Sequence, residues 1–377
     1  MKPLPSALLR VAKALPGDLR GHALAQVADL RRRLVAEPPL WLLAALRRLR
    51  PRLVLGPIEL RTRASEVRST LEDANAYPVT PYGRVMTELV GPFPLGQDGE
   101  PHTAGRARLE SILGTDAEAA SLPGSESRSQ SGSVSGSQSD SEAPSQSLEA
   151  WADRTARAMV AEAIAAGIPT DRLAGDVASR YPAEWAVHAG LVPAHTDPSA
   201  LATAATRLFA ACFGNLAGDR GVDRRGRAAA ADLGALGLDA ARIGLVVGAV
   251  PTVAEAVGNV VAELDAHPER WDAVLVATRA GDRDEVWRHA RECLRFRPQA
   301  PVLARGRADG DGLVLASTLS AMHDSAAVAD PALYLTERPE SAYLHFGHGS
   351  HRCAGERIAV VLIVSMVGAL AEGRLTG

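Results

Sequence analysis

Apolar residues recur every three to four positions over most of the chain, which is the spacing of helices that bury one face. The pattern predicts helical stretches in residues 1–50, 64–73, 102–113, 148–166, 171–191, 199–216, 224–247, 240–264 and 284–296. Strand-like alternation covers residues 53–60, followed by Thr62, and shorter strand-like pieces occur at 302–304 and 313–317. Glycine and proline recur through residues 77–99, which we therefore expect to be a loop. The sequence predicts a mainly α protein with small β-sheets.

The length and charge of the apolar stretches indicate whether the chain could span or contact a membrane. Residues 358–370 form the longest uncharged run and are shorter than the roughly 20 residues that span a bilayer, so they predict a buried helix. Residues 39–46 are leucine-rich and precede Arg47 and Arg48, which favours an amphipathic surface helix, with peripheral membrane contact as the alternative. The N-terminus lacks a secretory cleavage pattern. We expect a soluble cytoplasmic protein with no membrane partner.

The clearest break in composition is a serine-rich segment. Twelve of the 27 residues between 121 and 147 are serine, and Val134 is the one large apolar residue in the middle of the run. Neither a helix nor a strand could bury a face there, so we expect a disordered insertion. Because an apolar helical pattern resumes at residue 148, we place the insertion inside a single domain that spans residues 1–377.

Composition and charge narrow the class of protein. Hydrophobic residues make up 46% of the 377 residues, enough for a large core, and the net charge of −3 gives no overall attraction to nucleic acid. Cys212, Cys293 and Cys353 are odd in number and widely spaced, which favours a reducing compartment over a disulfide framework. At least one cysteine then needs a role other than cross-linking.

Cys353 lies in the sharpest local pattern of the chain. Two glycines, Gly347 and Gly349, precede it and allow positive φ and a close approach of the backbone to a flat partner. A long apolar helix follows, so backbone N–H groups at its start should stabilise a thiolate. A thiolate on a glycine-rich loop against an apolar helix suits axial ligation of a haem iron.

This loop resembles the haem-binding loop of the cytochrome P450 family, whose form is Phe-x-x-Gly-x-His/Arg-x-Cys-x-Gly. Every defined position is matched, by Phe346, Gly349, His351, Cys353 and Gly355. The resemblance, to soluble bacterial members, implies haem b (iron protoporphyrin IX) as the cofactor. It also implies Cys353 as the iron's axial ligand, and Gly347 and Ala354 among the residues that contact the haem. The family's fold places the haem between the central helix, here 240–264, and the helix after the cysteine.

Further family marks occur in the expected order. Glu292 and Arg295, followed by Arg297-Pro298, look like the family's Glu-x-x-Arg pair, and Glu285 with Arg288 is the weaker candidate. An i, i+3 pair shares a helix face and can form a buried ion pair. The cations that the resemblance assigns to the haem propionates are His102, Arg106, Arg305 and His351.

The central helix departs from the family pattern. Oxygen-activating members carry Ala/Gly-Gly-x-Asp/Glu-Thr there, and the acid and the alcohol relay protons. In this chain Gly248 is kept, Val250 replaces the acid, Pro251 replaces the first alcohol and Thr252 stands one place late. Val250 cannot donate a proton. A proline within a buried helix, which costs about 3 kcal/mol in an ideal one, often marks a place that accommodates something.

These marks imply a haem-thiolate oxidoreductase of the monooxygenase kind. The expected substrate is a small, apolar organic molecule in a biosynthetic pathway, a ferredoxin and its reductase are possible electron donors, and the chain is expected to be a monomer. The atypical residues of the central helix leave open a peroxide-dependent or hydroperoxide-rearranging enzyme. A third hypothesis is an inactive haem-binding relative that recruits a partner through the serine segment.

Overall fold

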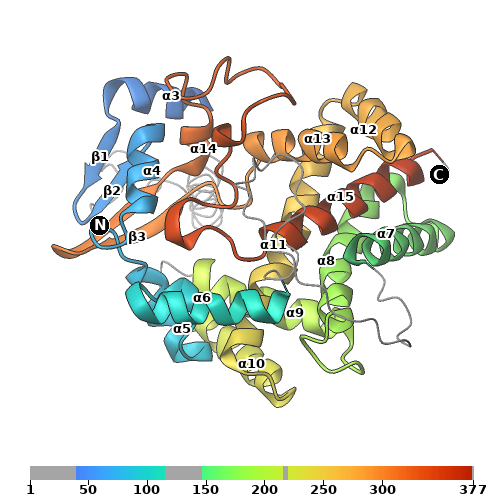
Figure 1. Ribbon diagram of the computed structural model, residues 1–377, viewed down its shortest axis with the longest axis horizontal. Helices are drawn as coiled ribbons and strands as arrows, with labels where there is room; N and C mark the ends of the chain where they lie inside the picture. The colour runs from blue at the N-terminus through green and yellow to red at the C-terminus, as the bar shows by residue number, and fades with distance from the viewer. Residues whose placement is uncertain (1–39, 115–146, 215–219, 376–377) are drawn as a thin grey trace, which may run out of the picture. The chain divides into compact units, whose positions relative to one another are not determined.

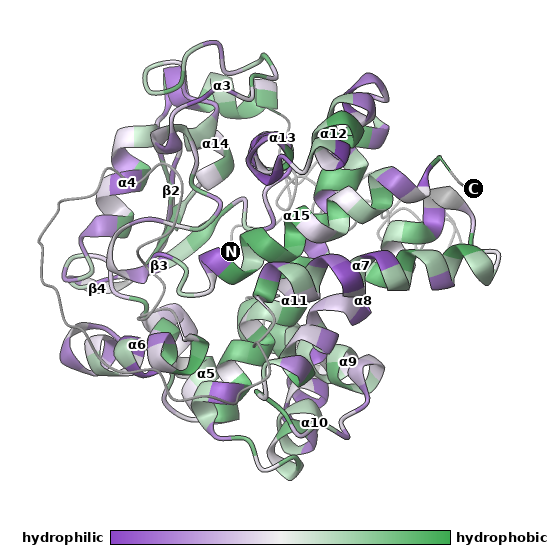
Figure 2. Cartoon of the chain, turned by 45° about the vertical axis from the view of Figure 1, so that its right-hand side comes forward, coloured by the Kyte–Doolittle hydropathy of each residue, from purple (hydrophilic) through white to green (hydrophobic). Residues whose placement is uncertain are grey.

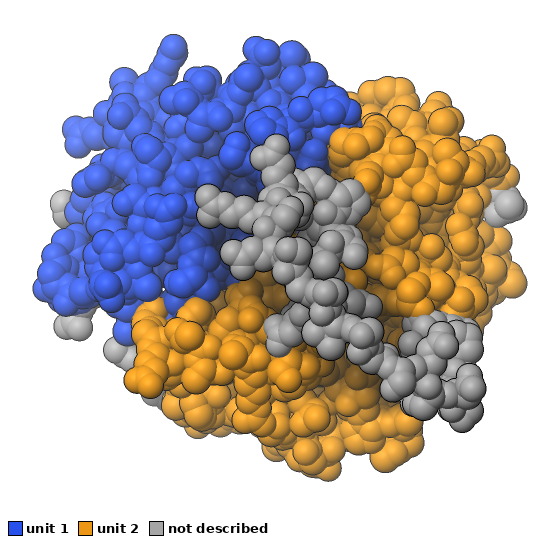
Figure 3. Space-filling view, in the orientation of Figure 1, with its two compact units in different colours: residues 1–82, 291–352 blue, residues 83–290, 353–377 orange. Residues whose placement is uncertain are grey.

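The computed structural model describes residues 40–114, 147–214 and 220–375 (Figure 1). The chain divides into two compact units, drawn in blue and orange in Figure 3. Unit 1 combines Met1–Tyr82 with Arg291–Arg352, and unit 2 combines Gly83–Ala290 with Cys353–Gly377. The mainly α architecture with a small sheet is confirmed. The single domain over 1–377 stays a prediction.

Unit 1 is built around a four-stranded sheet in the order β1-β2-β4-β3. Strands β2 and β4 are parallel, and the two outer pairs are antiparallel. Its elements are α3 (Leu40–Leu49), β1 (Arg52–Leu55), β2 (Ile58–Arg61), α4 (Ala64–Glu72), β3 (Leu303–Arg307), β4 (Gly310–Ala316), α14 (Thr318–Met322) and the 3-10 turns η3 (Glu340–Ala342) and η4 (Gly349–His351). An apolar cluster that includes Val67, Leu71 and Met322 joins α4 to α14.

The single strand expected at 53–60 is wrong. The structure has a hairpin instead, in which Leu55 pairs with Ile58 across a tight turn. Gly56 makes that turn at φ +65°, a conformation that glycine adopts freely. The alternation of apolar residues continues across the turn, and for this reason periodicity alone did not reveal it.

Unit 2 is helical and centres on α11 (Ala240–Asp265). Helix α11 packs against α8 (Thr170–His188), α9 (Pro198–Phe209) and α15 (Glu356–Gly373), and α15 packs against α7 (Leu148–Ala165) and α12 (Glu269–Ala280). The unit also holds α6 (Gly99–Leu113), α10 (Arg220–Ala235), the 3-10 turn η1 (Pro94–Gly96) and the π turn η2 (Ala210–Gly214). Two helices have residues in both units, namely α5 (Thr80–Val90) and α13 (Arg283–Phe296). Figure 2 shows α11 and α15 as mostly apolar helices.

Two sequence expectations for unit 2 need correction. The loop expected at 77–99 contains α5, because Pro81 lies in the first helical turn, where its missing N–H costs nothing. The continuous helix expected over 224–247 is interrupted between α10 and α11: Gly237 has φ +76° and Asp239 caps α11 by accepting a hydrogen bond from the Arg242 N–H. Helix α12 had no counterpart among the expectations.

Apart from the short α14, which also had no counterpart, the remaining helices agree with the sequence pattern, including α11 with Pro251 in its interior. Of the helical stretch expected over 1–50, residues 1–39 lie outside the described part of the chain, and α3 forms the rest. Among the described helices, α11 alone is long and apolar enough to cross a membrane, and half of its apolar window is buried, as in a core helix. The serine-rich insertion, apart from Ser147 at the start of α7, lies outside the described residues.

Candidate functional site

Cys353 lies just before α15, whose N-cap residue is Gly355. The Cys353 side chain is exposed, and it is a thiol, as are the buried Cys212 and Cys293. The start of a helix presents backbone N–H groups that favour a thiolate. Ala354 and Gly355 complete the same turn in unit 2. The structure therefore presents an accessible sulfur at a site suited to a negative charge.

The loop that leads to this cysteine belongs to unit 1 and presses on the end of α4. Gly347 and Gly349 have φ of +77° and +71°. A Cβ at Gly349 would lie 2.6 Å from the carbonyl oxygen of Leu71, so only glycine fits there. His348 Nε2 lies 2.7 Å from Oε1 of Glu72, which links the loop to the same helix end. Phe346 and His351 are half-buried.

A second carboxylate, Glu340, anchors the residue next to the cysteine. Its carboxylate accepts hydrogen bonds from Arg352 at 3.4 Å and from Arg291 at 3.2 Å. The Arg291 guanidinium also lies over the Tyr343 ring, 4.8 Å from its centroid. Sequence reasoning missed Glu72 and Glu340, because each is paired with the loop only by the fold of unit 1 and belongs to no local motif.

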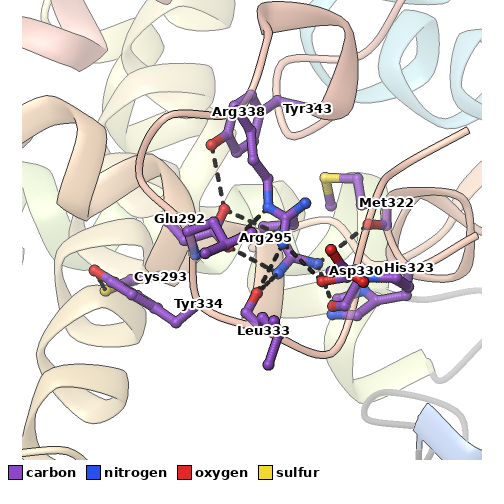
Figure 4. A network of polar contacts seen from close by, with 12 residues as sticks. Glu292, Cys293, Arg295, Met322, His323, Asp330, Leu333, Tyr334, Arg338 and Tyr343 are labelled. Atoms are coloured by element: carbon purple, nitrogen blue, oxygen red, sulfur yellow. Dashed lines mark hydrogen bonds and ion pairs between the residues drawn. The ribbon is translucent and has the colours of Figure 1, made fainter. Parts of the chain in front are cut away.

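Glu292 and Arg295 form a fully buried ion pair at the end of α13 (Figure 4). Two hydrogen bonds of 2.8 and 3.0 Å join the carboxylate to the guanidinium. Arg295 also donates to main-chain carbonyl oxygens at the end of α14 and in the segment that follows it, those of Met322, Pro331 and Leu333. The weaker sequence candidate, Glu285 with Arg288, is paired as well, but about 30% of each side chain is exposed (28% and 31%).

Arg338 and Tyr343 complete this network and were not found from the sequence. Arg338 Nε and the Tyr343 hydroxyl both donate to the Glu292 carboxylate, at 3.1 and 3.2 Å. Burial alone would raise the pKa of Glu292, but the hydrogen bonds from Arg295, the Leu335 N–H and Arg338 lower it below its ordinary value. Glu292 is therefore a carboxylate, and the charges in this dry site compensate one another.

The middle of helix α11 has an accessible stripe on a mostly buried surface. Gly248 and Glu255 are exposed and Thr252 is half-buried, and their i, i+4, i+7 spacing places them on one face. No described atom lies within 4 Å of a Cβ built on Gly248. The apolar residues beside this stripe are buried, namely Val247, Val250, Pro251 and Val253.

The two polar positions of the family pattern therefore differ in this chain. Val250 is two residues from Gly248, a rotation of about 200° around the helix, so it points away from the stripe. Thr252 lies on the stripe, but its hydroxyl donates a hydrogen bond to the carbonyl oxygen of Gly248. Although Glu255 is exposed overall, neighbouring protein atoms desolvate its carboxyl group and raise its pKa above the ordinary value.

The three remaining basic candidates lie on two elements. His102 and Arg106 occupy one face of α6, which packs against α11 in unit 2. Burial, and then the Arg106 guanidinium, lowers the pKa of His102 below its ordinary value. Arg305 lies on β3 in unit 1, is 4% exposed and donates to the carbonyl oxygen of Ala304 at 3.0 Å. Unit 2 thus holds Cys353, the α11 stripe and the α6 pair, and unit 1 holds Arg305 and the glycine loop.

Comparisons with known proteins identify the fold of the chain. No family profile matches the chain. The erythromycin C-12 hydroxylase of Saccharopolyspora erythraea is 33% identical over 136 residues, which are 31% of this chain and 33% of that enzyme. The open structure of cytochrome P450 EryK from S. erythraea superposes with a TM-score of 0.63 at 19% identity, over 88% of this chain and 86% of that one.

A further solved structure, P450BioI in complex with an acyl carrier protein bearing hexadec-9Z-enoic acid, superposes with a TM-score of 0.66. It is 16% identical and covers 90% of this chain and 92% of that one. The cofactor that this shared fold implies is iron protoporphyrin IX. The chain has the cytochrome P450 fold, and its resemblance to the bacterial cytochromes P450 is confirmed.

Proposed function

We propose that the chain is a haem-thiolate oxidoreductase of the cytochrome P450 kind, with Cys353 as the axial ligand of the iron. The observation that carries this proposal is the exposed Cys353 sulfur at the start of α15, in the same unit as the open stripe of α11. A thiolate is a ligand that haem iron accepts in this fold family.

The residues present fit a haem. Gly248 leaves open space on the accessible stripe of α11, as a flat group lying against the helix requires. The Arg106 guanidinium and the His102 imidazole, one turn apart on α6, are hydrogen-bond donors suited to propionates, and Arg305 is the buried cation that unit 1 offers. His351, Phe346 and the loop glycines would line the cysteine side.

When bound, the haem supplies the redox chemistry of oxygen or peroxide. The chain itself would hold the cofactor through Cys353 and keep water from the α11 face with apolar side chains. Glu292 and Arg295 would fix the segment after α14, which leads towards the cysteine loop, through the carbonyl oxygens of Met322, Pro331 and Leu333. These two are positioning residues, because they act through that segment.

The substrate we propose is a small, largely apolar organic molecule. The similar hydroxylase acts on erythromycin, and P450BioI is in complex with an acyl carrier protein bearing hexadec-9Z-enoic acid. As an ordinary monooxygenase the protein would draw electrons from a ferredoxin and its reductase. We place it in the cytoplasm, as a monomer, within a biosynthetic pathway.

A second candidate, a peroxide-dependent or hydroperoxide-rearranging enzyme, is favoured by the α11 residues. Val250 offers no proton and points away from the stripe, and the Thr252 hydroxyl is engaged by Gly248. Glu255, one turn beyond, is the acid that remains on this face. The two candidates differ in whether dioxygen with a reductant or peroxide alone supports turnover.

The axial assignment is tested by the carbon monoxide difference spectrum of the reduced, haem-loaded protein. The red-shifted Soret band of a thiolate ligand is expected, and Cys353→Ala should abolish it. Cys212→Ala is the matched control, because burial raises the pKa of that thiol to about 11 and keeps it protonated. A wild-type adduct without the band would refute both candidates and leave the inactive, partner-recruiting relative.

A turnover assay then distinguishes the monooxygenase from the peroxide-dependent enzyme. Product formed with NADPH, ferredoxin and reductase, and not with hydrogen peroxide, would support the monooxygenase and exclude the peroxide-dependent enzyme. Product formed with peroxide alone would reverse that conclusion.

A further inference from the structure

Helix α3 presents an exposed face that is both apolar and basic. Trp41 and Leu49 are 72% and 79% exposed. Ala45 and Arg48 follow Trp41 by four and seven positions, so Trp41, Ala45, Arg48 and Leu49 share one side of the helix, called here the Trp41 face. Among the described residues, Trp41 is the one aromatic side chain in the set of exposed large hydrophobic residues. Such an exposed tryptophan does not stabilise the core, and large exposed apolar side chains often mark interaction sites.

The opposite side of α3 is firmly attached within unit 1. Leu43 is 2% exposed, and Nη1 of Arg47 donates to both the carbonyl oxygen and the hydroxyl of Ser320 at 2.9 Å. Nε of Arg63 donates to the Arg47 carbonyl oxygen at 3.3 Å. Helix α3 thus lies on α14, as Figure 1 shows. The orientation of the Trp41 face is therefore fixed by the buried Leu43 and by polar contacts on the other side of the helix.

The charge of the chain is concentrated at the same end. Residues 1–52 contain eleven basic and three acidic residues, a net charge of +8, so the other 325 residues carry −11. Arg48 and Arg50 are exposed beside the Trp41 face. Arg52, 57% exposed, is paired with Glu66 at 2.7 Å. An anionic surface would complement this end of the chain and would be repelled by the remainder.

We propose that the Trp41 face, together with Arg50, binds the surface of an anionic phospholipid bilayer. Trp41 and Leu49 would enter the headgroup region, where tryptophan is favoured because its ring is apolar and its N–H is polar. Arg48 and Arg50 would pair with lipid phosphates. A nucleic acid would satisfy the arginines but offer no apolar environment for Leu49. This inference departs from the sequence-based expectation of no membrane partner and is independent of the proposed enzymatic activity.

The test is co-sedimentation of the full chain with phosphatidylcholine vesicles that contain or lack phosphatidylglycerol. Binding is expected only with phosphatidylglycerol and should weaken as salt rises. Arg48→Ala with Arg50→Ala should weaken it by about 25-fold, since each charge near an anionic surface contributes roughly fivefold. Trp41→Ser with Leu49→Ser should weaken it at least about tenfold through lost apolar contact.

Matched controls come from the same chain. Val276→Ser in α12 removes another exposed apolar residue (68% exposed), and Arg224→Ala with Arg225→Ala removes two exposed charges from α10. Both variants should bind as the wild type does. Trp41→Phe should keep binding, but it should lose the tryptophan quenching that brominated lipid causes in the wild type.

Three results would overturn the proposal. The first is no binding to phosphatidylglycerol vesicles, or binding that the Trp41 face variants leave unchanged. The second is competition by DNA or an acidic protein together with no effect of Trp41→Ser and Leu49→Ser, which would indicate a different class of partner. The third is a lower unfolding temperature of the serine double variant without loss of vesicle binding, which would mean that the chain itself covers this face.

Discussion

The Thr252 hydroxyl donates a hydrogen bond to the carbonyl oxygen of Gly248, one turn earlier in α11. A second, longer contact of 3.4 Å joins the same hydroxyl to the carbonyl oxygen of Ala249. Pro251, which precedes Thr252, has no N–H to donate to the previous turn. That missing N–H would have paired with the Val247 carbonyl oxygen, so the Thr252 hydroxyl does not replace it. The single alcohol on the accessible stripe is instead held by the carbonyl oxygens of Gly248 and Ala249.

Thr252→Val removes the hydroxyl and keeps the side-chain shape. We expect peroxide-supported oxidation of a chromogenic phenol to fall by far less than the roughly 100-fold that the loss of a proton-donating residue causes. Thr252→Ser, which keeps the hydroxyl, is the control. A loss of 100-fold in the valine variant with normal activity in the serine variant would show that the hydroxyl leaves Gly248 and acts in catalysis.

Glu292→Gln removes one charge from a pair that is fully buried. Arg295 would then lack its charge partner in a dry site, so the free energy of unfolding should fall by about 3–5 kcal/mol. Glu285→Gln breaks a pair that is about 30% exposed on the same helix (28% and 31%) and should cost at most ~1 kcal/mol. Urea denaturation of the three proteins measures both values, and equal losses would contradict the distinction between the two pairs.

The Glu292–Arg295 pair should also make folding stability fall at acidic pH. The folded-state pKa of Glu292 lies below its ordinary value of 4.5. Its stabilising contribution is therefore complete above pH 4.5 and is lost as the pH falls below that value towards the folded-state pKa. Arg338→Met, which removes one donor to Glu292, should shift the acid unfolding midpoint upwards.

Two buried histidines should make folding stability depend on pH over a higher range than Glu292 does. Burial, followed by Arg291 and Arg352, lowers the pKa of His345 to about 3, and burial, followed by Arg295, lowers that of His323 to about 4. The unfolded chain binds a proton on each ring below pH 6.5 while the folded chain does not. Folding stability should therefore decrease as the pH falls below 6.5, by up to about 1.4 kcal/mol per pH unit for each ring.

Urea denaturation at pH 7 and pH 5 tests this dependence. The difference between the two unfolding free energies should be about 2 kcal/mol smaller in His345→Gln than in the wild type. The exposed His195 provides the control, and His195→Gln should leave the difference unchanged. An unchanged difference in the His345 variant would mean that this ring is already protonated in the folded protein.

Two glycines of the cysteine loop should respond differently to alanine. At Gly349, φ is +71° and a Cβ would lie 2.6 Å from the Leu71 carbonyl oxygen, so Gly349→Ala should destabilise the haem-free protein by more than about 1 kcal/mol. At Gly355, φ is −92° and a Cβ meets no described atom within 4 Å. Gly355→Ala should leave haem-free stability unchanged. Thermal unfolding before haem loading compares the two, and equal losses would contradict the close contact at α4.

Phe93 lies against Gly244 of α11. A Cβ at position 244 would come within 2.0 Å of the ring, so Gly244→Ala should cost about 1–3 kcal/mol through overpacking. Gly248→Ala, one turn later in open space, is the matched control and should not show that loss. In a double-mutant cycle Phe93→Leu should recover part of the loss, whereas additive losses would indicate that the two residues do not touch.

Much of the helical architecture and the candidate ligand could be read from the sequence. Local spacing reveals the motif around Cys353 and the helical periodicity of residues 240–264. Local spacing also favoured Glu292 over Glu285, because Arg297-Pro298 follows Glu292 closely. Local spacing is what a sequence displays directly. The hairpin at Gly56 and helix α5 were missed because a turn can preserve alternation and a helix tolerates proline in its first turn.

The tertiary structure decided which polar groups surround these motifs. Glu72 and Glu340 on the cysteine loop, and Arg338 and Tyr343 on Glu292, are separated from their partners by between 12 and 276 residues. Their sequence neighbours carry no sign of the pairing, because a buried charge is matched by whatever group the fold brings within hydrogen-bond distance. The sequence by itself determined the family resemblance and Cys353 as the candidate sulfur ligand. Which face of α11 is open, where Thr252 directs its hydroxyl and that Trp41 faces outward depend on packing between elements that are distant in the chain.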